Sequence, residues 1–182
     1  MSMSGINPLK LAAVVYDDGV SVDALMTDFS RELIVAGVAA RGVVQLPPDA
    51  AGCGPAALMS LQMVRSGEII RMCQDLGPGS MSCALNPEVF TTVGMTLRQE
   101  ASEDCDIMFI SKFGKQEANG KGLRDEIAFV IASGCTLLTA VKRPLAPKWL
   151  QFTGGQGTLL DARAWVLRDW WSEVTMPRRA AA

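Results

Sequence analysis

The chain alternates short apolar runs with longer segments whose apolar residues recur at helical spacing. Leu9–Tyr16 is an apolar run with β-branched residues near its end, which indicates a buried strand. Val22–Ala36 has apolar residues three and four positions apart, the pattern of an amphipathic helix, with Ser21 as a plausible N-cap and Gly37 at its end. Gly42–Leu46 then indicates another strand. A strand, a helix and a strand in this order form a βαβ unit, so a parallel sheet is predicted.

The next segment departs from this alternation of strands and helices. Leu58–Val64 and Glu68–Cys73 are extended runs on either side of Ser66-Gly67, which predicts a β-hairpin inserted at about residues 58–74. Beyond it the alternation returns. The elements predicted there are a helix from Asn86 to about Ser102, a strand at Asp106–Ser111, a helix from Gly122 or Leu123 to Ser133, a strand at Thr136–Val141, a short helix at Pro144–Phe152, a strand at Thr158–Leu160 and a helix at Ala162–Trp171. The pattern predicts a three-layer α/β fold with a mainly parallel sheet and an inserted hairpin.

Length and composition favour one globular domain. The chain has 182 residues, of which 49% are hydrophobic and 20% charged. We expect an arm at residues 1–8, an α/β domain at 9–175 and a flexible tail at 176–182. The formal net charge of −2 offers no basic excess for nucleic-acid binding. No apolar run approaches the roughly 18 residues of a membrane helix, and the N-terminus does not read as a signal peptide, so a cytoplasmic protein without a membrane partner is expected.

Cysteine and histidine usage narrows the chemistry. The sequence has no histidine, which excludes Ser-His-Asp or Cys-His catalysis and any His-ligated metal. Its five cysteines are odd in number and include no C-x-x-C pair, so neither a disulfide framework nor a zinc ribbon is indicated. Cys105 and Cys135 lie beside apolar runs and read as small buried residues. Cys53 and Cys83, in loops flanking the hairpin, are either a thiol pair that is reactive or binds a soft metal, or partly buried loop cysteines, and the second interpretation is favoured.

The segment with the clearest candidate chemistry is Ile107–Glu126. Its apolar run stops at Ser111 and is followed by a loop with three lysines and three glycines: Lys112, Gly114, Lys115, Gly120, Lys121 and Gly122. A basic, glycine-bearing loop at the end of a core strand is a common place for an anion to bind. The alternative is a solvated loop whose lysines keep the protein soluble.

Three loops are predicted to meet at the carboxyl edge of the sheet: Asp17–Ser21, Lys112–Gly122 and the segment after Val141. The first leads into a helix N-terminus, the position of a phosphate-binding loop of the pattern G-x-x-x-x-G-K-[ST]. The residues depart from that pattern, since Ser21 replaces the second glycine, Val22 the lysine and Asp23 the Ser or Thr. The phosphate lysine and the magnesium hydroxyl are both missing.

Four blocks carry a resemblance to a known family: Val15–Gly19, Gly52–Ala56, Gln74–Ser80 and Lys112–Glu117. In this order they resemble a bacterial family known as a domain of unknown function, and the resemblance covers roughly residues 11–160. That family is similar in layout to small bacterial and archaeal nucleoside-triphosphatases with a P-loop fold, so the resemblance implies a P-loop-NTPase-like fold. It also implies a link to molybdate transport, because such proteins are often encoded near molybdate-transport genes.

The resemblance also identifies a second difference between this sequence and the motifs of the NTPases. In the NTPase relatives the central strand ends in a D-E-I-G-x-M-E block, and the corresponding slot here is Ser111–Glu117. Gly114 and Glu117 match the block, but its Asp-Glu pair has become Ser111-Lys112. Both phosphate-site motifs therefore differ from the NTPase pattern. This difference favours anion binding over ordinary Mg-ATP hydrolysis as the function.

We expect Lys112 or Lys115 to supply the lysine missing from the first loop, oriented by a pair with Asp17 or Asp18. The alternative is a structural ion pair that joins two loops without any ligand. Glu117 would act as a base or a metal ligand, or form a salt bridge to Lys121. The candidate ligand-binding set is Asp17, Asp18, Gly19, Ser21, Lys112, Gly114, Lys115 and Glu117, with no catalytic residue assigned.

The function indicated is binding of a nucleotide or a molybdate-type oxyanion with little or no hydrolysis. Two alternatives remain open. One is a divergent Mg-dependent nucleoside triphosphatase in which the acids hold the metal. The other is a non-catalytic, homo-oligomeric interaction module whose hairpin and Asp75–Cys83 loop form the interface.

Overall fold

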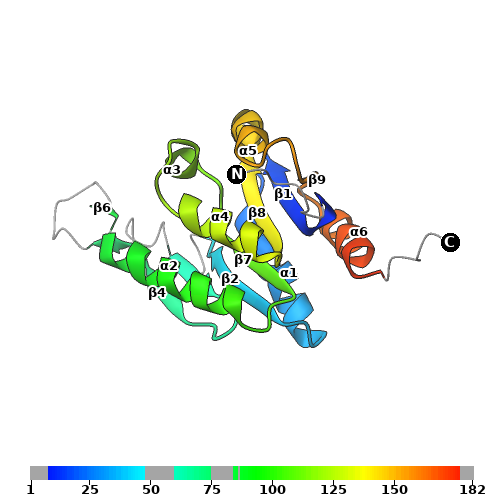
Figure 1. The fold of residues 1–182 in the computed structure, drawn as a ribbon, viewed down its shortest axis with the longest axis horizontal. Coiled ribbons are helices and arrows are strands. Elements are labelled where there is room, and N and C mark those ends of the chain that lie inside the picture. Colours follow the sequence, from blue (N-terminus) through cyan, green and yellow to red (C-terminus); the bar gives the residue numbers. More distant parts are fainter. Residues whose placement is uncertain (1–7, 48–59, 75–83, 86, 177–182) are drawn as a thin grey trace.

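A computed structural model describes residues 8–47, 60–74, 84–85 and 87–176, and these fold around one mainly parallel sheet (Figure 1). The parallel strands are β1 (Leu11–Tyr16), β2 (Ala40–Gln45), β7 (Ile107–Ile110), β8 (Thr136–Lys142) and β9 (Thr158–Asp161). The apolar runs predicted these strands, and the structure confirms them with small shifts of their ends.

The predicted hairpin is also confirmed. It consists of β3 (Ser60–Met63) and β4 (Ile69–Arg71), and β3 pairs antiparallel with β2. The resulting sheet has seven strands in the order β4-β3-β2-β7-β8-β1-β9. A small ladder of β5 (Cys73–Gln74) and β6 (Ala84–Leu85) follows, which the sequence did not predict. Cys53, the whole Asp75–Cys83 loop and the cap at Asn86 lie outside the described residues.

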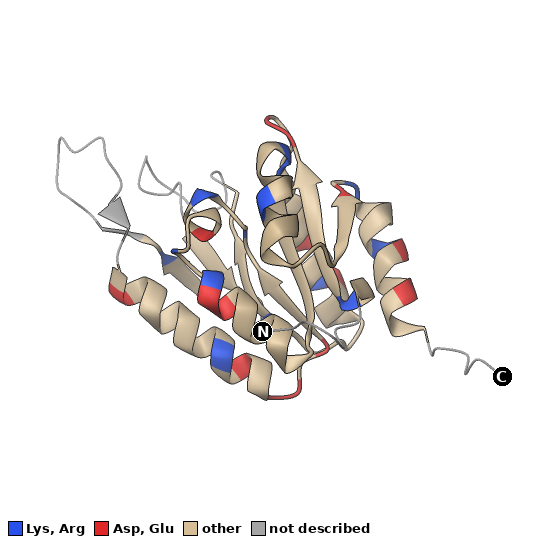
Figure 2. Ribbon diagram, turned by 45° about the horizontal axis from the view of Figure 1, so that its top comes forward, with Lys and Arg blue, Asp and Glu red and all other residues tan. Residues whose placement is uncertain are grey.

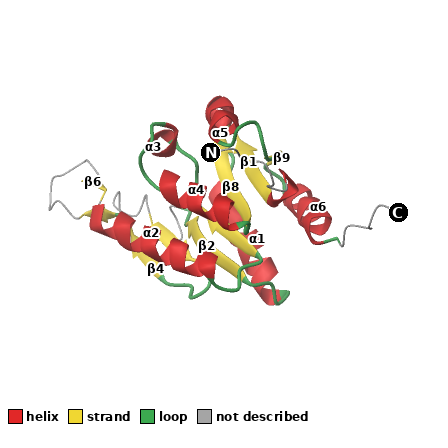
Figure 3. Cartoon of the chain, in the orientation of Figure 1, coloured by secondary structure: helices red, strands yellow, loops and turns green. Residues whose placement is uncertain are grey.

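Helices cover both faces of the sheet and complete the three layers (Figure 3). One face carries α1 (Val22–Val35) and α6 (Ala164–Thr175), and the other carries α2 (Pro87–Ser102), α4 (Arg124–Ser133) and α5 (Ala146–Phe152). The remaining short elements are η1 (Pro8–Lys10), α3 (Lys115–Ala118) and η4 (Arg143–Leu145). The four-residue α3 lies inside the lysine loop, where the sequence predicted only a loop.

The central strands are apolar along their length because helices cover both sides of them. In β7 all four residues are fully buried. Met108 and Ile110 pack in the cluster with α2 and α4, while Ile107 and Phe109 pack in the cluster with α1 and α6. In helix α6, Trp170 is 3% exposed and packs in the cluster with α1, whereas Trp165 is 58% exposed.

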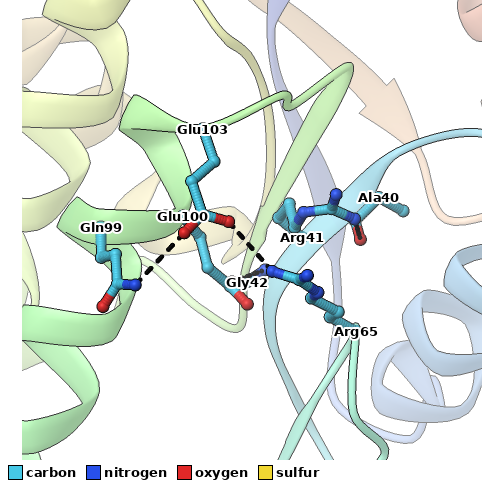
Figure 4. A network of polar contacts seen from close by, with 7 residues as sticks. All are labelled: Ala40, Arg41, Gly42, Arg65, Gln99, Glu100 and Glu103. Atoms are coloured by element: carbon cyan, nitrogen blue, oxygen red, sulfur yellow. Dashed lines mark hydrogen bonds and ion pairs between the residues drawn. The ribbon is translucent and has the colours of Figure 1, made fainter.

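Gly42 links the hairpin to helix α2 (Figure 4). Its φ of +95° turns its amide out of the β2 ladder, and this N–H donates to Glu100 Oε2 at 2.8 Å, while its carbonyl accepts from Val64 N at 2.8 Å. A Cβ at this position would lie 2.0 Å from the carbonyl oxygen of Phe109, so only glycine fits. The salt bridge from Arg65 in the hairpin turn to Glu103, directly after α2, adds a second link at the surface.

Candidate functional site

The candidate site lies at the carboxyl edge of the sheet, where the strand connections reverse direction. From β1 the chain crosses through α1 to β2 on one side, whereas from β8 it crosses through α5 to β9 on the other side of β1. A reversal of this kind opens a crevice at the strand ends of doubly wound sheets, the usual place for a ligand. Ion pairs join the first and third of the three predicted loops, and the second is linked to the first turn of α1 through Lys112 and Asp23.

Two exposed ion pairs connect the loop after β1 with the end of β8, where acidic and basic segments meet in Figure 2. Arg143 holds Asp17 through both carboxylate oxygens, at 2.9 Å from Nε to each and 2.8 Å from Nη2 to Oδ2. These hydrogen bonds lower the pKa of Asp17 below its usual value. Lys142 pairs with Asp18.

The expectation that Lys112 or Lys115 would pair with Asp17 or Asp18 is therefore wrong. The reason is the strand order. Because β8 is the direct neighbour of β1, with Tyr16 in register with Lys142, residues that follow these two strands meet each other. Strand β7, which leads to the lysines, lies one strand further away.

Lys112 instead reaches the first turn of α1 and pairs with Asp23. Its Nζ lies 2.8 Å from Oδ1 and 2.9 Å from Oδ2 of Asp23, and 5.8 Å from the centre of the Tyr16 ring. The two charged side chains are 24% and 16% exposed, so this pair is better shielded from water than the pairs of Asp17 and Asp18. Burial, with smaller contributions from Asp23 and Asp18, raises the pKa of Tyr16 to about 12 and keeps its hydroxyl protonated.

Asp23 was not among the predicted site residues. Its signal was present in the sequence, because Asp23 stands where a phosphate-binding loop has the Ser or Thr that holds magnesium. Recognising its role required knowing which lysine comes near it.

The lysine loop is held in a fixed shape by Glu117. This carboxylate is 8% exposed and accepts a hydrogen bond from Gly114 N at 2.9 Å and another from Leu123 N at 3.0 Å. Gly122 has φ +62°, and a Cβ there would lie 2.1 Å from Glu117 Oε1. The Arg124 guanidinium donates to the Glu117 carbonyl at 3.0 Å. The Glu117 carboxylate is thus directed at backbone amides rather than at Lys121.

A cavity of about 220 Å³ opens beside this loop, towards the hairpin. Its walls combine apolar side chains with amides and lysines. They include Gln45, Leu61, Met72, Phe90, Lys112 and Lys115. Lys115 is exposed and faces this cavity, whereas Lys112 borders the cavity and also reaches Asp23.

The structure therefore divides the predicted set into two groups that share Lys112. Asp17, Asp18, Gly19 and Ser21 lie together in the loop before α1, where Gly19 has φ +87° and Ser21 is the N-cap residue without a side-chain capping bond. Gly114, Lys115 and Glu117 form the second group beside the cavity. Among the described residues, no group of three or more Cys, Asp or Glu side chains could hold a metal ion. In the same part of the chain, no helix is long and apolar enough to span a membrane.

The fold and this edge of the sheet define a three-layer α/β domain with a mainly parallel sheet and a crevice at the carboxyl ends of its strands. The chain belongs to a protein family of unknown function, DUF2478, whose model matches residues 11–170. It is 36% identical over 171 residues to the molybdenum import ATP-binding protein ModC 2 of Bradyrhizobium diazoefficiens. That match covers 93% of this chain but 19% of the relative, so the chain spans about a fifth of the relative's length.

Two solved structures share the fold. THEP1 from Aquifex aeolicus matches with a TM-score of 0.63 and 16% identity over 91% of this chain and 100% of its own. A human cancer-related nucleoside triphosphatase matches with a TM-score of 0.64 and 16% identity over 93% of this chain and 99% of its own. The resemblance to the family of unknown function is therefore confirmed. The resemblance to the small P-loop NTPases is confirmed for the fold alone, because the sequence identity is 16%.

Proposed function

We propose that this domain binds a small oxyanion, either the phosphate group of a nucleotide or a molybdate-type anion, and that it does so without magnesium. The observation that carries the proposal is the Lys112–Asp23 ion pair. In P-loop NTPases, Mg²⁺ is held between the loop's Ser or Thr and an acidic residue of a neighbouring strand. In this chain Asp23 stands in place of the loop's Ser or Thr, and Ser111-Lys112 stands in place of the acidic residue of the neighbouring strand.

The lysine ammonium thus replaces the metal as the positive charge of the site. Lys112 would repel Mg²⁺ and attract an anion, while Asp23 keeps its ammonium group in place. The positive end of α1 adds backbone N–H groups near Gly19 and Ser21. Arg143 and Lys142 neutralise Asp17 and Asp18, which would otherwise repel a negatively charged ligand.

The comparisons support the choice of ligands. The fold is shared with a protein named as a nucleoside triphosphatase, and the relative at 36% identity is named for molybdenum import and ATP binding. Because this chain lacks the phosphate lysine and the magnesium hydroxyl of the motif, slow or absent hydrolysis is expected. The domain would then serve as a ligand-sensing unit linked to molybdate homeostasis.

Calorimetric titration with molybdate, phosphate and ATP, each with Mg²⁺ and with a chelator, tests the proposal. At least one anion should bind with the same affinity in both conditions. Lys112→Ala should weaken that affinity about tenfold or more, since it removes a charge-assisted contact of roughly 1.5–3 kcal/mol. Lys148→Ala is the matched control, because Lys148 is an exposed lysine on α5. Binding that requires Mg²⁺, or that Lys112→Ala leaves unchanged, would refute the proposal.

The cavity beside the lysine loop favours a nucleotide over a bare oxyanion. Its apolar walls at Leu61, Met72 and Phe90 suit an organic group attached to the phosphate. Phe90→Ala should therefore weaken ATP binding and leave molybdate binding unchanged. Equal effects of Phe90→Ala on both ligands would remove the preference for a nucleotide.

A further inference from the structure

A thiol pair lies at the edge of the sheet opposite the candidate site. Cys105 and Cys135 precede β7 and β8, which are parallel neighbours with Ile107 in register with Thr136. The register brings the two Sγ atoms within 2.6 Å of each other. Both residues are free cysteines and half-buried, so neither thiol is sealed inside the core.

The surroundings make the two thiols chemically different. The hydrogen bond from Cys105 lowers the pKa of Cys135, and the Lys10 ammonium lowers it further. Lys10 is held next to Cys135 by a hydrogen bond of 3.3 Å to the Gly134 carbonyl. Donating that bond, together with burial, raises the pKa of Cys105. Cys135 is thus the more acidic thiol of the pair and Cys105 the less acidic one.

We propose that Cys105 and Cys135 form a reversible disulfide modification site that reacts with low-molecular-mass disulfides of the glutathione type. The Cys135 thiolate attacks one sulfur of the reagent, forming a mixed disulfide and releasing one reagent thiolate. The Cys105 thiol then loses its proton and attacks the Cys135 sulfur, which forms the intrachain bond and releases the second reagent thiol. The two protein thiols are oxidised and the reagent disulfide is reduced to two thiols.

The bond would stabilise the native fold. It closes a loop of the chain that contains β7, the lysine loop and α4, so the unfolded chain loses conformational freedom. The folded chain needs little rearrangement, because the strands that carry the two thiols are already paired. The oxidised protein should therefore unfold at a temperature on the order of 10 °C higher than the reduced protein. This inference is independent of the proposed ligand.

The test uses the full chain with Cys53, Cys73 and Cys83 replaced by serine. After incubation with oxidised glutathione, mass spectrometry should show the loss of two hydrogens and a peptide that joins Cys105 to Cys135, and a reducing agent should reverse both the mass change and the higher melting temperature. The proposal is overturned if both thiols remain alkylatable after oxidation.

Two single variants test the assigned roles. Cys105→Ser should accumulate a stable glutathione adduct at Cys135, because the resolving thiol is gone. Cys135→Ser should react several-fold more slowly at Cys105. Equal rates for the two variants, measured at a temperature where both are folded, would contradict the assignment of Cys135 as the nucleophile.

Discussion

At the scale of single residues, the contact between Gly42 and Glu100 shows how a buried charge is held in this protein. Glu100 is 6% exposed, and its hydrogen bond from Gly42 N is one of the contacts that fix α2 on the sheet. Burial raises the pKa of Glu100, and the hydrogen bond from Gly42 only partly opposes this effect. The carboxyl group is thus needed as an acceptor for Gly42 N, while burial disfavours its ionised form.

The pH dependence of stability follows from this raised pKa. Because the pKa of Glu100 is higher in the folded than in the unfolded chain, its contribution to stability is complete below the unfolded value of about 4.5 and is lost as the pH rises through the folded value. Glu100→Gln keeps an acceptor oxygen and has no charge. It should match the wild type near pH 4 and be more stable at pH 8, as measured by urea unfolding at both values.

Glu100→Ala is the control for that experiment. It removes the acceptor and leaves the Gly42 N–H buried without a partner, so it should be less stable than the wild type at both pH values, by about 1–3 kcal/mol. A difference between Glu100→Gln and the wild type that does not change with pH would contradict the raised pKa.

At the scale of elements, the lysine loop is the segment that sequence reasoning placed correctly but described incompletely. Glycine and lysine spacing predicted a loop that could accept an anion. It did not predict α3, because the four residues Lys115–Ala118 are too few to show a helical period. Nor did it assign Glu117 to the backbone amides of Gly114 and Leu123, since that contact depends on how the loop folds back on itself.

Glu117→Gln tests how far this carboxylate holds the loop. Both of its oxygens accept backbone N–H groups, and glutamine can offer only one oxygen. The substitution should cost about 1–3 kcal/mol and speed amide exchange at Gly114 or Leu123. Urea unfolding and NMR exchange measure the two effects. Glu103→Gln, at an exposed salt bridge, should cost less than about 1 kcal/mol. A similar cost for both variants would show that Glu117 does not brace the loop.

The elements themselves were largely predictable, whereas the contacts between them were not. Apolar periodicity located α1 and the buried run located β7, because both signals are local in the sequence. The Asp17–Arg143 pair depends on β8 lying next to β1, and the thiol pair depends on β7 lying next to β8. Strand order is a property of the whole sheet, so no local pattern could assign these partners.

At the scale of the whole molecule, burial divides the sheet into a protected centre and exposed edges. Strands β7 and β8 lie between other strands, and helices cover both of their faces. Strand β4 lies at one edge, where Ile69 is 52% exposed, and β9 lies at the other. The candidate site sits at the ends of the central strands, so the most rigid part of the sheet supports the loops that would bind the ligand.

Hydrogen exchange should reveal this division. Amides of β7, β8 and β1 should exchange only through global unfolding, with rates that rise steeply with denaturant, while amides of β4 and β9 should exchange through smaller openings that depend weakly on it. A bound anion should slow exchange in residues 17–21 and 111–123, because ligand binding stabilises the conformation it contacts. Strand β4, which is remote from these loops in the strand order, is the internal control. Equal protection of β4 and β7 without ligand would contradict the protected centre, and slowing confined to β4 would place the ligand away from the proposed site.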